Sequence, residues 1–247
     1  MEKKQFDKNK IIKKLGDGIE SDVYLYNEDG NKTVIKLFKD EVDKDNKELK
    51  LELLSKEKLL LQEMKFLNRI YKDNKFIGYT STYEPTEPFL NYMSKTKSIK
   101  INLLNQLQDK YQVLNENGIY IGDFNLENFR VKDGKLKLID LDNFSIDGLD
   151  FDVKNPYMED YLNKCTKLDN IDYYCFNYFT MSFIANILPV CLEAIIIQSG
   201  LPKEFNNEEC KKIYHDLITI NDNYQKEKYT NGNDVTLLKC MKKGLFK

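Results

Sequence analysis

The first third of the chain alternates apolar and polar residues, the pattern of β-strands. Five such runs predict strands, at residues 11–15, 22–26, 33–38, 66–71 and 76–82. After residue 98 the apolar residues recur with a helical period instead. The pattern therefore predicts an α+β protein with a β-rich front and a helical back.

The turn between the second and third predicted strands sets their register. Asp29-Gly30 is a strong hairpin signal, and a turn there pairs Val23 with Lys36 and Leu25 with Val34. Because side chains alternate across a strand, these four residues share one face. A lysine on an otherwise apolar face requires an anionic partner to offset its desolvation.

Apolar periodicity predicts the helices. Residues 44–62 indicate one or two helices whose many lysines are expected to form a solvated face, and residues 99–115 form a clear amphipathic pattern. Residues 171–187 predict a strongly apolar helix. Between the strands and the helices, residues 84–88 (EPTEP) break the regular pattern and predict a connector.

Composition excludes several classes of function. The chain has 247 residues, 41% of them hydrophobic, and a formal net charge of −2, so no global field attracts nucleic acid or an anionic membrane. The start lacks the apolar core of a signal peptide, and the most apolar stretch, 183–197, contains Pro189 and Glu193. We therefore expect a cytoplasmic protein with neither a nucleic-acid nor a membrane partner.

Histidine and cysteine usage narrows the chemistry further. One histidine leaves no material for a histidine triad or a histidine metal cluster, and the five cysteines include no CxxC pair. An odd number of widely spaced cysteines is typical of reduced packing residues.

Oxygen-bearing side chains gather in residues 118–144. A hairpin turn at Asp133-Gly134 places Asn128 beside Asp140 at the open end of the hairpin, with Asp142 two residues further on. Asp123 reaches the same end from the preceding loop. Carboxylate and amide oxygens suit a hard divalent cation, so this run predicts a Mg²⁺ site.

Four motifs occur in one order along the chain. Residues 16–23 (GDGIESDV) are similar to the glycine-rich loop GxGxxGxV, residues 34–36 (VIK) to the VAIK strand, residues 114–128 to the segment ending in HRDLKPEN, and residues 139–142 (IDLD) to the DFG region. In this order they resemble the protein kinase-like superfamily. Met158-Glu159 stands where the APE motif would be, and Asp172 opens an apolar helix as a kinase aspartate does.

The resemblance implies a fold and an activity. It implies a bilobal fold with a five-stranded antiparallel N-lobe (1–83) carrying one or two helices, a connector (84–90) and a mainly helical C-lobe (91–247). The implied activity is ATP- and Mg²⁺-dependent transfer of the γ-phosphate to a hydroxyl, with a bacterial-type Ser/Thr protein kinase-like enzyme favoured. A small-molecule kinase of the aminoglycoside or choline type and a nucleotide-binding pseudokinase are the alternatives. The substrate stays undetermined.

The resemblance also implies residue roles. The residues that would cover the nucleotide are Leu15, Gly16, Gly18, Ser21, Val23 and Val34. Lys36 would hold the α- and β-phosphates, oriented by a helix glutamate for which Glu48 is favoured over Glu52 and Glu57. Asp123 would accept the proton of the attacking hydroxyl, and Asn125 occupies the position of the catalytic-loop lysine. Asn128 and Asp140 would bind Mg²⁺, with Asp142 as a direct or indirect further contact.

Departures from the family pattern bear on the substrate and on regulation. Gly122 replaces the arginine that orders a phosphorylated activation loop, and Ser145 is the one Ser or Thr in residues 142–159. We therefore predict activation without loop phosphorylation. Arg130 stands where an apolar residue usually lies under the adenine, so Phe129 or Ile139 is the alternative floor. Gly122 and Asn125 favour the small-molecule alternative.

Overall fold

The computed structural model describes residues 1–60, 63–149, 151, 156–164, 170–218 and 236–245. The fold is α+β, as the sequence predicts. The chain forms two compact units, of which the first comprises Met1–Thr86 and Leu138–Asp142 and the second Glu87–Lys137 and Asn143–Lys247. A short segment from the middle of the chain therefore belongs to the first unit.

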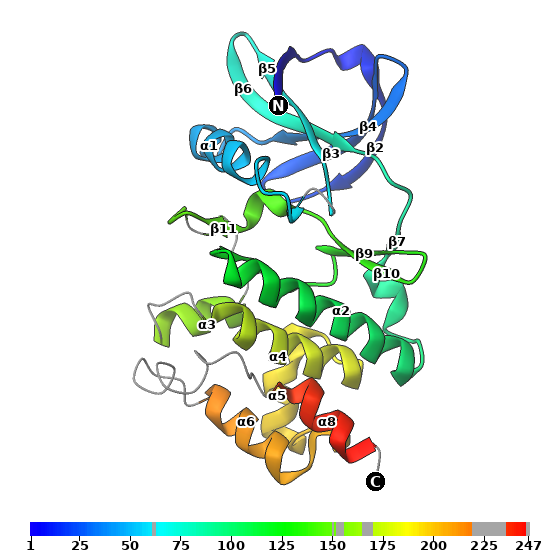
Figure 1. Ribbon diagram of the computed structural model, residues 1–247, viewed down its shortest axis with the longest axis vertical. Helices are drawn as coiled ribbons and strands as arrows, with labels where there is room; N and C mark the ends of the chain where they lie inside the picture. The colour runs from blue at the N-terminus through cyan, green and yellow to red at the C-terminus, as the bar shows by residue number, and fades with distance from the viewer. Residues whose placement is uncertain (61–62, 150, 152–155, 165–169, 219–235, 246–247) are drawn as a thin grey trace. The chain divides into compact units, whose positions relative to one another are not determined.

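A six-stranded sheet dominates the first unit (Figure 1). Its strands are β1 (Glu2–Gln5), β2 (Ile11–Asp17), β3 (Ser21–Glu28), β4 (Asn31–Phe38), β5 (Phe66–Lys72) and β6 (Lys75–Thr82). They lie in the order β1-β5-β6-β4-β3-β2. All five strands predicted from alternation are present, and each is longer than predicted by one or two residues at one or both ends.

The prediction of five antiparallel strands is wrong in one respect, because β1 adds a sixth strand parallel to β5. Glu2 pairs with Asn68 and Gln5 with Tyr71. The residues of β1, EKKQ, have no apolar alternation, so no pattern marks them as a strand. Main-chain hydrogen bonds to the sheet edge hold β1 in place instead.

Tight turns set the register of the hairpins. Asp29 and Gly30 both have positive φ, of 53° and 87°, the conformation of a two-residue hairpin turn that matches the strand twist. Val23 pairs with Lys36 and Leu25 with Val34, which confirms the predicted register.

Helix α1 (Lys44–Leu54) packs beside this sheet (Figure 1). It begins at Asp43, whose side chain accepts a hydrogen bond from the backbone N–H of Asn46 at 3.1 Å and so satisfies one of the exposed donors of the first turn. Its buried face carries Lys47, Lys50, Leu51 and Leu54. Two lysines thus lie on the side that faces the protein, so the prediction of a solvated lysine face is wrong for both.

The second unit is mainly helical. Its helices are α2 (Lys97–Glu116), α3 (Pro156–Lys164), α4 (Ile171–Ala185), α5 (Pro189–Ser199), α6 (Glu208–Ile218) and α8 (Leu237–Leu245). Helix α4 is buried on every side, since it packs against α2, α3, α5 and α8 (Figure 1). An apolar sequence without a polar face predicts such a central helix.

Two small sheets complete the second unit. Strands β10 (Lys135–Leu138), β9 (Phe129–Lys132) and β7 (Glu87–Pro88) form one sheet, and β8 (Ile119–Tyr120) pairs with β11 (Ser145–Ile146) in the other. The hairpin of β9 and β10 turns at Asp133-Gly134, as predicted, with both residues at positive φ. The last residue of β10, Leu138, is also the first residue of the segment that belongs to the first unit.

Within the described part of the chain, no helix is long and apolar enough to cross a membrane. Cys175, Cys191, Cys210 and Cys240 are free thiols, whereas Cys165 lies outside the described residues.

Candidate functional site

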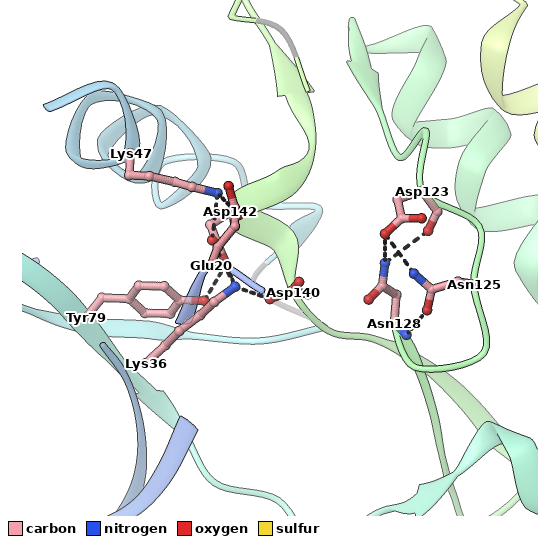
Figure 2. A network of polar contacts seen from close by, with 9 residues as sticks. All are labelled: Glu20, Lys36, Lys47, Tyr79, Asp123, Asn125, Asn128, Asp140 and Asp142. Atoms are coloured by element: carbon pink, nitrogen blue, oxygen red, sulfur yellow. Dashed lines mark hydrogen bonds and ion pairs between the residues drawn. The ribbon is translucent and has the colours of Figure 1, made fainter. Parts of the chain in front are cut away.

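Lys36 is the centre of a buried ion network in the first unit (Figure 2). It lies on β4 and is 5% exposed. Its ammonium donates to Asp140 and to both carboxylate oxygens of Asp142, at 2.9 and 3.0 Å. The anionic partner that an inward lysine requires is therefore a pair of carboxylates from the segment after β10.

Asp142 binds more donors than Lys36 alone. Tyr79 on β6 donates its hydroxyl at 2.7 Å, and Lys47 on α1 lies 3.3 Å away. Asp142 has no solvent exposure, so three donors from three elements replace its hydration. Lys47 also donates to Glu20, in the turn between β2 and β3, at 2.9 Å.

Charge pairing outweighs burial in setting the pKa values of Lys36 and Asp142. Burial would lower the pKa of Lys36, but the carboxylates of Asp140 and Asp142 raise that pKa above its ordinary value. Burial would likewise raise the pKa of Asp142, yet Lys36 and Lys47 hold it below its ordinary value. Burial and the same carboxylates raise the pKa of Tyr79 well above 10, so its phenol stays a donor.

Asp140 differs from Asp142 in exposure and backbone. Its side chain is 29% exposed, and its φ of 62° lies in the left-handed region. Burial and the neighbouring charge of Asp142 raise the pKa of Asp140, against the opposing effect of Lys36. Asp140 adopts this conformation outside a hairpin turn, which makes its partly exposed carboxylate a candidate for a functional role.

The prediction that Glu48 orients Lys36 is wrong. Glu48 accepts hydrogen bonds from Arg69 at 3.2 Å and from the Tyr71 hydroxyl, both on β5. The alternative Glu52 pairs with Lys56 at 3.1 Å. Neither Glu48, Glu52 nor Glu57 is among the ion-pair partners of Lys36 in the described residues. The reason is that Glu48 follows Lys47 by one residue and therefore lies beside, not on, the buried face of α1.

Asp142 is not arranged as a direct metal ligand, whereas its indirect contact with a metal stays a prediction. Each of its oxygens already accepts two donors, and a cation there would have to displace ammonium groups. Sequence reasoning missed Lys47 and Tyr79, which donate to Asp142, and Glu20, which accepts from Lys47. The available signal was the spacing 47-50-51-54, which follows a helical stripe and so marks both lysines as buried.

The predicted nucleotide-covering residues lie at the turn between β2 and β3 and on the adjoining strands. Leu15 is exposed, Val23 and Val34 are half-buried, and Ser21 is buried. The Gly18 N–H donates to the Ser21 carbonyl at 2.9 Å, and Lys39 donates to the Gly18 carbonyl at 2.6 Å. These two hydrogen bonds hold the turn through the backbone of Gly18.

A second polar cluster lies in the second unit, in the loop between β8 and β9 (Figure 2). Asp123, 5% exposed, accepts hydrogen bonds at Oδ2 from the side-chain amides of Asn125, at 2.7 Å, and Asn128, at 2.8 Å. Asn125 also accepts from the backbone N–H of Glu127 and Asn128, at 2.8 and 3.1 Å. The loop thus holds the Asp123 carboxylate in one orientation.

Asp172, at the start of α4, anchors this loop. Its two oxygens accept the backbone N–H groups of Ile121, at 2.8 Å, and Gly122, at 2.6 Å. Burial raises the pKa of Asp172 to about 7, although the two N–H groups oppose that shift. The fully buried carboxyl group of Asp172 therefore fixes the backbone at the start of the Asp123 loop.

Gly122 is required by shape. Its φ is +64°, and a Cβ atom would lie 2.5 Å from the Phe151 ring and 2.8 Å from the Met158 methyl group. An arginine at this position has no room in this packing. Phe129, considered as an alternative adenine floor, instead packs against Phe89 and Phe124 in the core.

The predicted metal ligands Asn128 and Asp140 belong to different units. Their placement side by side, inferred from the hairpin, stays a prediction. Among the described residues, no group of three or more His, Cys, Asp or Glu side chains is arranged to hold a metal. This donor set still fits Mg²⁺, which commonly takes one or two protein oxygens and completes its shell with water and phosphate oxygens.

Gly78 on β6 determines how closely β6 approaches β4 at Lys36. A Cβ atom at Gly78 would lie 2.0 Å from the Lys36 carbonyl oxygen. We expect Gly78→Ala to lower the free energy of unfolding by about 2–4 kcal/mol, because the main chain must move. Chemical denaturation of the variant and the wild type measures this difference in the free energy of unfolding. Gly16→Ala is the control: its nearest neighbour would be 4.0 Å away, so equal losses in both variants would contradict the steric argument.

No protein-family model matches this chain, and no curated protein matches its sequence.

Proposed function

We propose that the chain is an ATP- and Mg²⁺-dependent phosphotransferase with a bilobal protein kinase-like fold. It transfers the γ-phosphate of ATP to a hydroxyl group, and a Ser/Thr protein kinase-like enzyme is the favoured subclass. The observation that carries this proposal is the ion pair between buried Lys36 and partly exposed Asp140. A buried ammonium beside an exchangeable carboxylate is suited to receive phosphate oxygens in place of that carboxylate.

The glycine-rich turn supports nucleotide binding. Gly16 has no left-handed φ, and a Cβ atom there would meet its nearest neighbour only at 4.0 Å. Neither backbone conformation nor packing in the first unit therefore requires a glycine. A residue without a side chain does, however, allow the close approach of a phosphate chain to the backbone.

The second unit supports the transfer step. Asp123 would accept the proton of the attacking hydroxyl, and the amides of Asn125 and Asn128 would keep its carboxylate oriented for that proton. The work of the chain's residues would be placement and charge stabilisation, with no covalent intermediate.

Mg²⁺ is the implied metal. Asp140 would offer a carboxylate oxygen, and Asn128 is the second predicted ligand, whose amide oxygen lies opposite the nitrogen bonded to Asp123. The ion would neutralise negative charge on the phosphates.

One observation favours the small-molecule alternative. Because Phe151 and Met158 leave no room for a side chain at Gly122, the arginine through which a phosphorylated loop is ordered cannot be accommodated here. An enzyme without that device is expected to be active as synthesised. Both proteins and small molecules should therefore be tested as acceptors of the phosphoryl group.

Nucleotide binding and transfer are tested together. We expect Mg²⁺-ATP at about 100 times its Kd to raise Tm by about 5 °C or more, and EDTA to reduce that shift. We further expect γ-labelled ATP to label a hydroxyl acceptor in a protein or metabolite pool. Binding without transfer would contradict the enzyme and leave a nucleotide-binding scaffold. The absence of both would contradict the proposed function.

A further inference from the structure

Asp142 binds the Lys36 ammonium through both of its carboxylate oxygens. Both carboxylate oxygens lie within 3.0 Å of the Lys36 ammonium, so the contact restricts the direction of the side chain as well as its distance. We propose that Asp142 is the positioning residue that orients Lys36 toward the nucleotide phosphates, in place of a glutamate from α1. This inference rests on the proposed function.

Asp142 is itself held rigidly. The Tyr79 hydroxyl binds Oδ1 at 2.7 Å, and the Lys47 ammonium lies 3.3 Å from Oδ2. The side chain has no solvent exposure. Because its donors come from β4, β6 and α1, Asp142 cannot turn away from Lys36 without breaking its hydrogen bonds to three buried polar groups.

The two carboxylates on Lys36 consequently have different roles. Asp140 is partly exposed and can turn toward a cation or yield Lys36 to a phosphate, whereas Asp142 is enclosed and stays bound. Lys36 would therefore remain oriented through the exchange. Helix α1 provides a cation, Lys47, at the place where the resemblance leads one to expect a carboxylate.

Lys47 also links Asp142 to the glycine-rich turn. Its ammonium lies 2.9 Å from Glu20, which is in that turn, and 3.3 Å from Asp142. Asp142 thus contacts both Lys36 and Lys47, and Lys47 in turn binds Glu20 in the glycine-rich turn. A change at Asp142 is expected to alter phosphate binding through both connections.

The test is a double-mutant cycle on the binding of Mg²⁺-ATP, measured by calorimetry. We expect Asp142→Asn to weaken binding by about 10- to 100-fold and Asp142→Glu, which keeps the charge, to weaken it less. Tyr79→Phe removes one donor to Asp142, and we expect a loss of a few fold. In a Lys36→Met background, the additional loss caused by Asp142→Asn is expected to be clearly smaller, because only the connection through Lys47 remains.

Asp40→Asn is the matched control, since Asp40 is a fully exposed carboxylate of the same unit. Its affinity should equal that of the wild type. An unchanged affinity in Asp142→Asn, or an equal loss with and without Lys36, would overturn the positioning role. If Asp142→Asn does not fold, the folded Tyr79→Phe variant decides, and an affinity equal to the wild type contradicts the inference. Failure of the wild type itself to bind Mg²⁺-ATP would instead contradict the proposed function.

Discussion

Asp123→Asn is expected to slow phosphoryl transfer by about 10²- to 10⁴-fold while leaving the affinity for Mg²⁺-ATP within about threefold of the wild type. An asparagine has the shape of aspartate, and its amide oxygen can still accept the hydrogen bonds of Asn125 and Asn128. It cannot accept a proton from an attacking hydroxyl. Parallel measurements of transfer rate and nucleotide affinity separate the two effects.

Asp133→Asn is the control for this experiment. Asp133 lies in the exposed turn between β9 and β10, at a φ of 50° that asparagine tolerates. We expect its transfer rate to equal that of the wild type. Transfer in Asp123→Asn at the wild-type rate would mean that another group accepts the proton, and the assignment of Asp123 would be wrong.

Asp172→Ala is expected to give the largest loss of stability, about 2–6 kcal/mol at pH 5. Its carboxyl group accepts the buried N–H groups of Ile121 and Gly122, and alanine leaves both without an acceptor at a cost of about 1–3 kcal/mol each. Asp172→Asn keeps one acceptor oxygen, so we expect an intermediate loss. Chemical denaturation of the three proteins gives the order; an alanine variant as stable as the wild type would contradict it.

The same variants test the charge of Asp172. Burial raises its pKa to about 7 in the folded protein, from about 4 in the unfolded chain. Between these values the folded state binds more protons, so its stability relative to Asp172→Asn falls as pH rises from 4 to 7 and levels off above. The total change is on the order of 4 kcal/mol. Parallel pH profiles for wild type and Asp172→Asn would show that the pKa is not raised.

Local signals predicted most of the sheet and the helices. The Asp29-Gly30 turn determined the pairing of Val23 with Lys36, because strand periodicity and turn geometry depend on neighbouring residues alone. Strand β1 could not be predicted, since its pairing with β5 relies on main-chain groups that every residue possesses. The kinase-like arrangement of the whole chain stays a proposal.

The partners of Lys36 could be predicted only in part. An anionic partner follows from the desolvation of a lysine on an apolar face, whereas the side chain of α1 that reaches this site depends on the rotation of the helix. A rotation of one residue, about 100°, exchanges Lys47 for Glu48 at the network. The spacing 47-50-51-54 follows the buried stripe, but two of its four residues are lysines, so apolar periodicity alone does not reveal that angle.

The first unit is not a continuous stretch of chain, because Leu138–Asp142 belongs to it. During synthesis, Lys36, Lys47 and Tyr79 emerge from the ribosome long before Asp140 and Asp142. These two carboxylates neutralise the lysines, and Asp142 accepts the hydrogen bond of Tyr79. A fragment ending at Thr86 would lack Asp140 and Asp142 and would bury two ammonium groups without these counterions. The nascent sheet is therefore expected to complete its interior only after residue 142 has left the ribosome.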